Sequence, residues 1–166
     1  MPAPRSRSRA PVTTVIALLA AVLVSCAGGG TPELRVLGTP QVAAPIAGSS
    51  QVAVTVANDG DGDDVLVGAS TDAAIAAEIH RTTITDGAAV MEVLEQVPIP
   101  AGEQLVFRPG ELHLMLVVPD ETVREGGTLR LVLEFERSGD VVVDATVVDL
   151  LDLAEDAADA REAEDA

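Results

Sequence analysis

Short runs of alternating apolar and polar residues fill the chain from about residue 51 to residue 149. In residues 51–57, Val52, Val54 and Val56 alternate with smaller or polar neighbours, a pattern typical of a β-strand with one buried face. Similar runs predict strands at 64–69, 75–84, 90–97, 104–108, 112–118, 128–136 and 141–149. Residues that favour turns (Gly, Pro, Asn and Asp) separate them. The pattern therefore predicts an all-β domain over residues 35–149, folded as an antiparallel β-sandwich.

Residues that can bind a metal lie on the non-core faces of two predicted strands. In strand 112–118 the alternate aliphatic residues share the predicted core face, whereas His113 and Met115 share the other face. In strand 75–84, His80 lies on the face opposite Ile75 and Ile79. Met91 comes just after a predicted turn, at the start of strand 90–97. The phase of the strands therefore allows these four side chains to meet outside the core.

His80, Met91, His113 and Met115 are all the histidines and methionines of the chain apart from Met1. Neutral thioethers favour Cu(I), and imidazole suits copper in either oxidation state, so the set predicts a site for one Cu(I) per chain. A blue-copper centre would need a cysteine thiolate, but the chain has a single cysteine, Cys26, near its N-terminus. With both histidines used by the metal, no nucleophile has a recognisable base, and we expect no enzymatic activity.

The spacing of these four residues, H-x10-M-x21-H-x-M, resembles the signature of the PCuAC family of periplasmic copper chaperones. The resemblance covers about residues 52–148 and includes Glu78-Ile79-His80, Ile99-Pro100-Ala101-Gly102 and the LHLML run at 112–116. It implies a cupredoxin-like Greek-key β-sandwich that carries Cu(I) to a copper-accepting oxidase subunit or assembly factor, for the copper centres of cytochrome c oxidase. The region before residue 51 lacks the aromatic residues often found in relatives, and the C-terminal tail is acidic where some relatives have histidine and methionine.

The N-terminus has the features of an export signal. Three arginines at positions 5, 7 and 9 precede an apolar run at 12–24, which is too short to span a bilayer comfortably. Leu23-Val24-Ser25-Cys26 resembles a bacterial lipobox, in which Cys26 is lipidated, although an ordinary signal peptide cleaved near Cys26 is the alternative. We therefore expect a signal at 1–26, a flexible tether at 27–34 and a lipid anchor on the extracytoplasmic face of the bacterial cell membrane.

The charge of the chain limits its partners. It has 10 basic and 27 acidic residues, a net charge of −17, and none of the basic residues is lysine. Such a surface excludes nucleic acid as a partner and leaves the lipid anchor as the membrane contact. The acidic tail at 150–166 has no apolar stripe beyond Leu150, Leu151 and Leu153, so we expect disorder, with a frayed helix as the alternative. We also expect the domain to be a monomer. The alternative to copper transport is a metal-free, immunoglobulin-like adhesion or scaffold lipoprotein.

Overall fold

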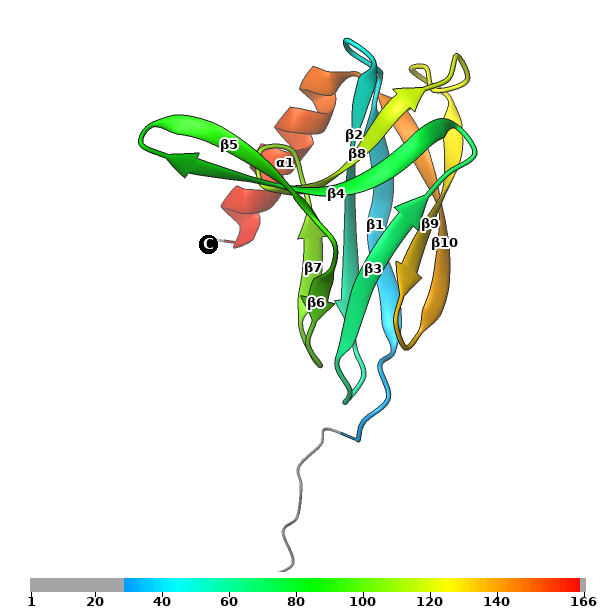
Figure 1. Cartoon of the computed structure of the whole chain (residues 1–166), viewed down its shortest axis with the longest axis vertical. Coiled ribbons are helices and arrows are strands. Elements are labelled where there is room, and N and C mark those ends of the chain that lie inside the picture. The colour runs from blue at the N-terminus through cyan, green and yellow to red at the C-terminus, as the bar shows by residue number, and fades with distance from the viewer. Residues whose placement is uncertain (1–28, 165–166) are drawn as a thin grey trace, which may run out of the picture.

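The computed structural model describes residues 29–164, which form ten strands and one helix (Figure 1). The strands are β1 (Leu34–Ala43), β2 (Ser49–Asn58), β3 (Asp64–Ser70), β4 (Ala74–Thr85), β5 (Ala88–Leu94), β6 (Val97–Ile99), β7 (Gln104–Phe107), β8 (Leu112–Pro119), β9 (Thr128–Phe135) and β10 (Gly139–Val148). The helix is α1 (Leu150–Glu164). The predicted all-β class is confirmed.

The strands form one sheet that closes on itself. Its order is β5-β4-β8-β2-β1-β10-β9-β3-β6, and β7 pairs with β2. An additional pairing of β3 with β4, at Ala69 and Ala77, joins the two sides of the sheet into a barrel. Sequence neighbours are often not spatial neighbours, as in a Greek key, and the β1–β10 pair is parallel whereas the other pairs are antiparallel. The β4–β5 hairpin extends beyond the side of this barrel (Figure 1).

The core consists of aliphatic side chains from alternate positions of the strands, as the pattern predicted. In β2 the three valines 52, 54 and 56 are at most 4% exposed, whereas the residues between them are half-buried. Leu114 and Leu116 of β8 are fully buried on the face that points into the barrel. Both phenylalanines of the chain, Phe107 and Phe135, are also buried. The core thus excludes water without tryptophan or tyrosine.

Two strand assignments differ from the sequence prediction. The segment before residue 51, where the sequence predicts no particular strand, forms β1 and pairs with both β2 and β10. The run at 90–97 is divided into β5, which is exposed at the edge of the sheet, and β6, which pairs with β3. A single run of residues cannot show this division, because it depends on which distant strand each half joins.

The expectation of a disordered tail is wrong for residues 150–164, which form α1. Leu153 and Ala157 lie one helical turn apart, are 1% and 8% exposed, and form a narrow apolar stripe. Asp149 caps the helix, because its carboxylate accepts a hydrogen bond of 2.8 Å from the backbone N–H of Leu151. Gln41 of β1 donates a hydrogen bond of 2.8 Å to Asp156 and ties the helix to the sheet. Two buried residues are therefore enough to hold an otherwise acidic helix.

The export signal predicted at 1–26, with Cys26, lies outside the described residues. The predicted tether at 27–34 is fixed to the barrel earlier than expected, because Thr31 and Glu33 donate backbone hydrogen bonds to Asp61 and Asn58. Arg137 also donates to the carbonyl of Gly30, at 2.6 Å. Between residues 29 and 164, no helix has the length and apolar character needed to cross a membrane.

Candidate metal centre

The two histidines face each other on neighbouring antiparallel strands. His80 of β4 is the direct partner of His113 of β8 in the register of this pair. Side chains at opposed positions of an antiparallel pair project to the same side of the sheet. The two imidazole rings accordingly lie with their centroids 5.7 Å apart and their planes at 70°. Two segments far apart in sequence thus contribute one pair of nitrogen donors.

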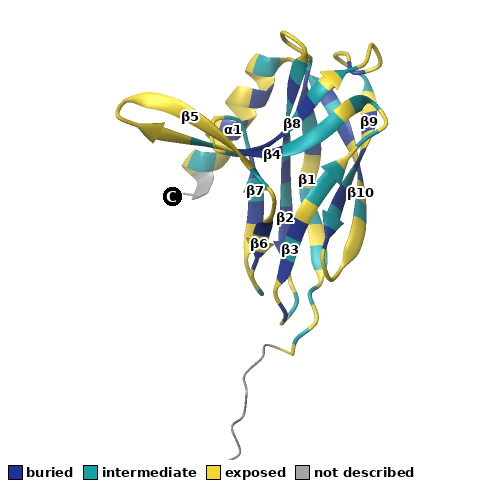
Figure 2. Ribbon diagram, viewed as in Figure 1, coloured by how far each residue is buried: buried dark blue, intermediate teal, exposed yellow. Residues whose placement is uncertain are grey.

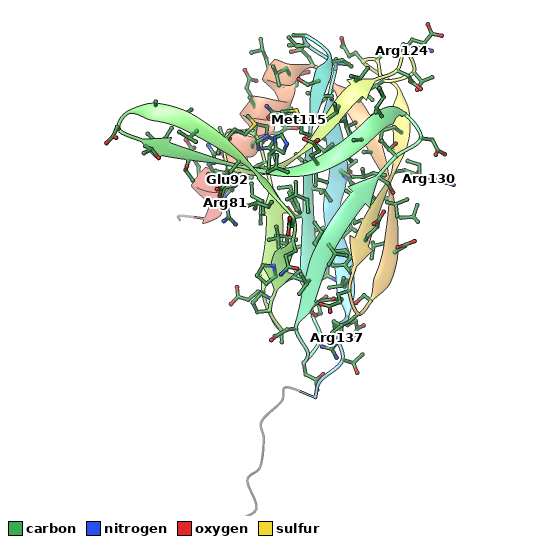
Figure 3. The ribbon with its side chains drawn as sticks, viewed as in Figure 1. Arg81, Glu92, Met115, Arg124, Arg130 and Arg137 are labelled. Carbon is green, nitrogen blue, oxygen red and sulfur yellow. The ribbon has the colours of Figure 1, made fainter. Side chains whose placement is uncertain are left out.

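The two methionines lie on the same face as the histidines. Met91 of β5 is opposite Thr82, two residues beyond His80 on β4. Met115 of β8 is opposite Glu78, two residues before His80. Figure 3 shows Met115 near the point where β8 runs beside β4. The register therefore brings the four residues singled out from the sequence to one face, whereas the fifth, Cys26, lies outside the described residues.

The four side chains differ in their exposure to solvent. The other face of β4 and β8 supplies the core, so the predicted direction of His80 and His113 away from the core is confirmed. Both imidazoles are nevertheless buried, with His80 8% exposed and His113 1% exposed. Met115 is half-buried and Met91 is 49% exposed, on a hairpin whose outer end is largely exposed (Figure 2). Solvent thus reaches this set of donors mainly from the side of Met91.

Hydrogen bonds to oxygen occupy one nitrogen of each imidazole ring. Nδ1 of His113 is 3.1 Å from the backbone carbonyl of Glu111, and because a carbonyl only accepts, Nδ1 carries the proton. Nε2 of His113 is buried and has no hydrogen-bond partner among the described residues. His80 Nδ1 is 3.0 Å from the sulfur of Met91, and its Nε2 is 2.8 Å from a carboxylate oxygen of Glu78.

Burial lowers the pKa of His113, and ion pairs hold the turn beside it. Burial lowers the pKa of His113 below its usual value, with a smaller contribution from His80, although the hydrogen bond to the Glu111 carbonyl acts in the opposite direction. The Arg108 guanidinium lowers the pKa of the Glu111 carboxyl through a hydrogen bond, and Arg161 of α1 adds to this effect. Glu111 is 2.9 Å from Arg108 and 3.0 Å from Arg161, so two ion pairs fix the turn that precedes His113.

This arrangement suits a soft, monovalent metal ion. Within residues 29–164, no three or more His, Cys, Asp and Glu side chains are grouped so that they could hold a metal ion. The donors present are two imidazoles and two thioethers, which together favour copper and, through sulfur, Cu(I). The unpartnered Nε2 of His113 is the donor atom whose burial a bound metal would best explain, because buried polar atoms are normally satisfied.

Two acidic residues of this region were not assigned a role from the sequence. Glu78 was recognised as part of the EIH run of the motif but not as a hydrogen-bond partner of His80. Its position two residues before His80 places both side chains on one face of a strand, and this spacing could have revealed it. The hydrogen bond between the Glu111 carbonyl and His113 could not be found in this way, because it depends on the conformation of the turn just before β8.

Comparison with known proteins places the fold. A protein named as a lipoprotein, Lxx21020 of Leifsonia xyli subsp. xyli (strain CTCB07), is 35% identical over 92 residues, which are 54% of this chain and 55% of that protein. The chain thus matches about half the length of this curated relative. The copper-bound PCuAC domain from PmoF2 is similar in structure with a TM-score of 0.58 at 23% identity, over 70% of this chain and 92% of that domain.

A second solved structure is closer in sequence. The solution structure of CuI-DR1885 from Deinococcus radiodurans has a TM-score of 0.57 at 28% identity, over 68% of this chain and 76% of that one. These similarities confirm the cupredoxin-like β fold that the motif implied. The model of the LpqE-like lipoproteins matches residues 35–147, which span nearly the whole barrel. The chain therefore belongs to the LpqE-like lipoprotein family.

Proposed function

We propose that this protein is an extracytoplasmic copper chaperone that binds one Cu(I) through His80, Met91, His113 and Met115. The observation that carries the proposal is Nε2 of His113, which is buried without a hydrogen-bond partner on the face that also holds His80. A buried nitrogen without a partner costs about 1–3 kcal/mol in lost hydration. Coordination to a metal ion would recover this free energy.

The donor set and the structural relatives both support copper as that metal. All four donors are neutral, so a bound Cu(I) would bring a single positive charge into a partly buried site, and the carboxylate of Glu78 lies close enough to balance it. Two of the similar structures carry copper by name: one is a copper-bound PCuAC domain and the other is a CuI form. Binding, and not catalysis, is therefore the function that the site supports best.

Release of copper would begin at Met91. Met91 is half-exposed, whereas His113 is covered, so an incoming thiolate or imidazole of a partner reaches the metal from the Met91 side. Val93 and Ile84 lie on the same face of the hairpin and are 64% and 72% exposed, which gives this side an apolar border. A partner donor replaces one thioether at a time, so that the ion is never released into water.

The motif and the family support a proposal for the acceptor and for the location. The PCuAC-like ligand spacing supports delivery to a copper-accepting oxidase subunit or assembly factor, for the copper centres of cytochrome c oxidase. The net charge of −17 favours an acceptor whose docking surface is basic. Membership of a lipoprotein family supports a lipid anchor on Cys26 at the extracytoplasmic face of the membrane.

Copper stoichiometry tests the proposal against a metal-free adhesion or scaffold lipoprotein. A chain of residues 26–166 with Cys26→Ser would be loaded with Cu(I) without oxygen and equilibrated with bicinchoninate as a competing chelator. We expect one Cu(I) per chain, and loss of that copper in a His80→Leu, His113→Leu double variant. A wild-type chain that surrenders all of its copper to bicinchoninate would overturn the proposal and favour the scaffold.

A further inference from the structure

Glu78 has a position at the candidate copper site that the four-residue ligand set does not explain. It lies on the ligand face of β4, two residues before His80 and directly opposite Met115 of β8. Its carboxylate oxygen Oε2 is 2.8 Å from Nε2 of His80. The Glu78 side chain is 42% exposed, but the side chain of His80 that it contacts is only 10% exposed. The contact therefore closes the outer side of a largely buried ring.

This contact decides which nitrogen of His80 carries the proton. An ionised carboxylate only accepts hydrogen bonds, so Nε2 of neutral His80 must be the donor. The other nitrogen, Nδ1, then has a free lone pair and faces the sulfur of Met91 at 3.0 Å. A thioether is a weak acceptor and cannot compete with a carboxylate for the ring proton.

His113 is held in the opposite tautomer. The backbone carbonyl of Glu111 accepts a hydrogen bond from Nδ1 of His113, and this leaves Nε2 as the free, buried donor atom. The two imidazoles therefore present different nitrogens, although they occupy paired positions of the same two strands. A histidine that binds a metal commonly donates its other N–H to a carboxylate or a backbone carbonyl. Here the partner of His80 is the Glu78 carboxylate, and the partner of His113 is the Glu111 carbonyl.

We propose that Glu78 is a positioning residue of the copper site, which fixes His80 as an Nδ1 ligand while the Glu111 carbonyl fixes His113 as an Nε2 ligand. This inference rests on the proposed function for the metal, but the tautomers it assigns exist in the copper-free protein. Loss of the Glu78 carboxylate frees the His80 ring to rotate and to exchange its proton between nitrogens. Loss of such a hydrogen-bond partner of a ligand typically lowers metal affinity by about 10–100-fold.

The test combines nitrogen NMR with copper competition on residues 26–166 carrying Cys26→Ser. Two-bond ¹H–¹⁵N correlation of the copper-free protein reports the protonated nitrogen of each ring, and the Cu(I)-loaded protein reports the bound one. We expect His80 to be protonated at Nε2 and bound through Nδ1, and His113 to show the reverse. Copper bound through Nε2 of His80, or a copper-free His80 protonated at Nδ1, would overturn the assignment.

Variants of Glu78 separate positioning from general effects of charge or folding. Glu78→Leu should lower Cu(I) affinity about 10–100-fold and mix the His80 tautomers, whereas Glu78→Gln, which keeps an acceptor oxygen, should restore most of both. Glu92→Leu is the matched control, because Glu92 of β5 lies opposite Arg81 of β4 in the strand register, on the other face of the same hairpin (Figure 3). Equal affinities in Glu78→Leu and Glu92→Leu would overturn the role of Glu78.

The same measurements distinguish the two ideas. If the wild-type chain takes up no Cu(I), the proposed function fails, and with it the role of Glu78 toward the metal, whatever the tautomers. If the wild-type chain binds one Cu(I) and His80 binds through the wrong nitrogen, the function stands and the present inference fails.

Discussion

Leu153→Ala should detach α1 from the barrel without unfolding the barrel. Leu153 is 1% exposed, whereas Leu151 on the same helix is 72% exposed, so Leu153 is the main apolar anchor of α1. Replacing a buried leucine by alanine costs about 2–5 kcal/mol, depending on how far the surroundings collapse into the space. The cost falls on the contact between helix and sheet, because Leu153 is not part of the barrel core.

The remaining contacts of α1 are too weak to hold it. Ala157 buries about one methyl group, worth roughly 1 kcal/mol, and the exposed hydrogen bond from Gln41 to Asp156 contributes about as much. The ion pair of Arg161 with Glu111 is partly exposed and contributes at most about 1 kcal/mol. A helix of 15 residues is marginal by itself in water, and the many acidic residues of this one repel each other.

Undocking should weaken copper binding only slightly. It removes Arg161 from Glu111 and from the carbonyl of Pro109, but Arg108 still holds Glu111 at 2.9 Å. A contribution below about 1 kcal/mol corresponds to less than about a fivefold change in affinity, since 1.4 kcal/mol is tenfold. The turn before His113, with Gly110 at a φ of 80° that glycine adopts without strain, remains as it is.

Circular dichroism and copper competition check this prediction. Leu153→Ala should lose helical signal in the far ultraviolet, keep the cooperative unfolding of the barrel, and retain Cu(I) within about fivefold of wild type. Leu151→Ala is the matched control and should change none of the three. Retention of the helical signal together with a large drop in the unfolding temperature would refute the reasoning, because α1 would then be part of the cooperative core. A loss of affinity beyond about 100-fold would show that α1 helps to form the site.

Three further predictions concern the site and the anchor. Met115→Leu should weaken Cu(I) binding by more than about 100-fold in chelator competition, beyond the usual cost of a lost supporting hydrogen bond. It should change stability by less than about 1.5 kcal/mol, because the volumes are similar; unchanged affinity would remove Met115 from the site. Protonation of His113 should weaken copper binding only below the ordinary histidine pKa of about 6.5, because burial lowers the pKa of His113. The unfolded chain then binds more protons than the folded one just below that pH, so the stability of the copper-free protein should decrease as the solution is acidified. A Cu(I) affinity that climbs steeply above about pH 8 would indicate a thiolate ligand and contradict this ligand set. Cys26→Ser should move the protein from the membrane to the soluble fraction with copper binding unchanged, and a variant that still sediments with membranes would exclude a lipid on Cys26.

The sequence by itself determined the class of fold and the direction of the ligand side chains. Alternation with a period of two is a local property, because neighbouring side chains of a strand point to opposite faces whatever the strand pairs with. This was enough to place Leu114 in the core and His113 and Met115 on the other face. The supply of donor residues, two histidines and two internal methionines, was likewise visible without coordinates and indicated copper.

Only the tertiary structure decided which residues meet. The pairing of His80 with His113 depends on β4 lying beside β8, and such contacts between distant segments leave no trace in local alternation. The burial of both imidazoles, and the bond from His113 to the Glu111 carbonyl, follow from the same packing. The helix α1 escaped prediction because its apolar face consists of little more than Leu153 and Ala157, and so small a face stabilises a helix only where a sheet is present to cover it.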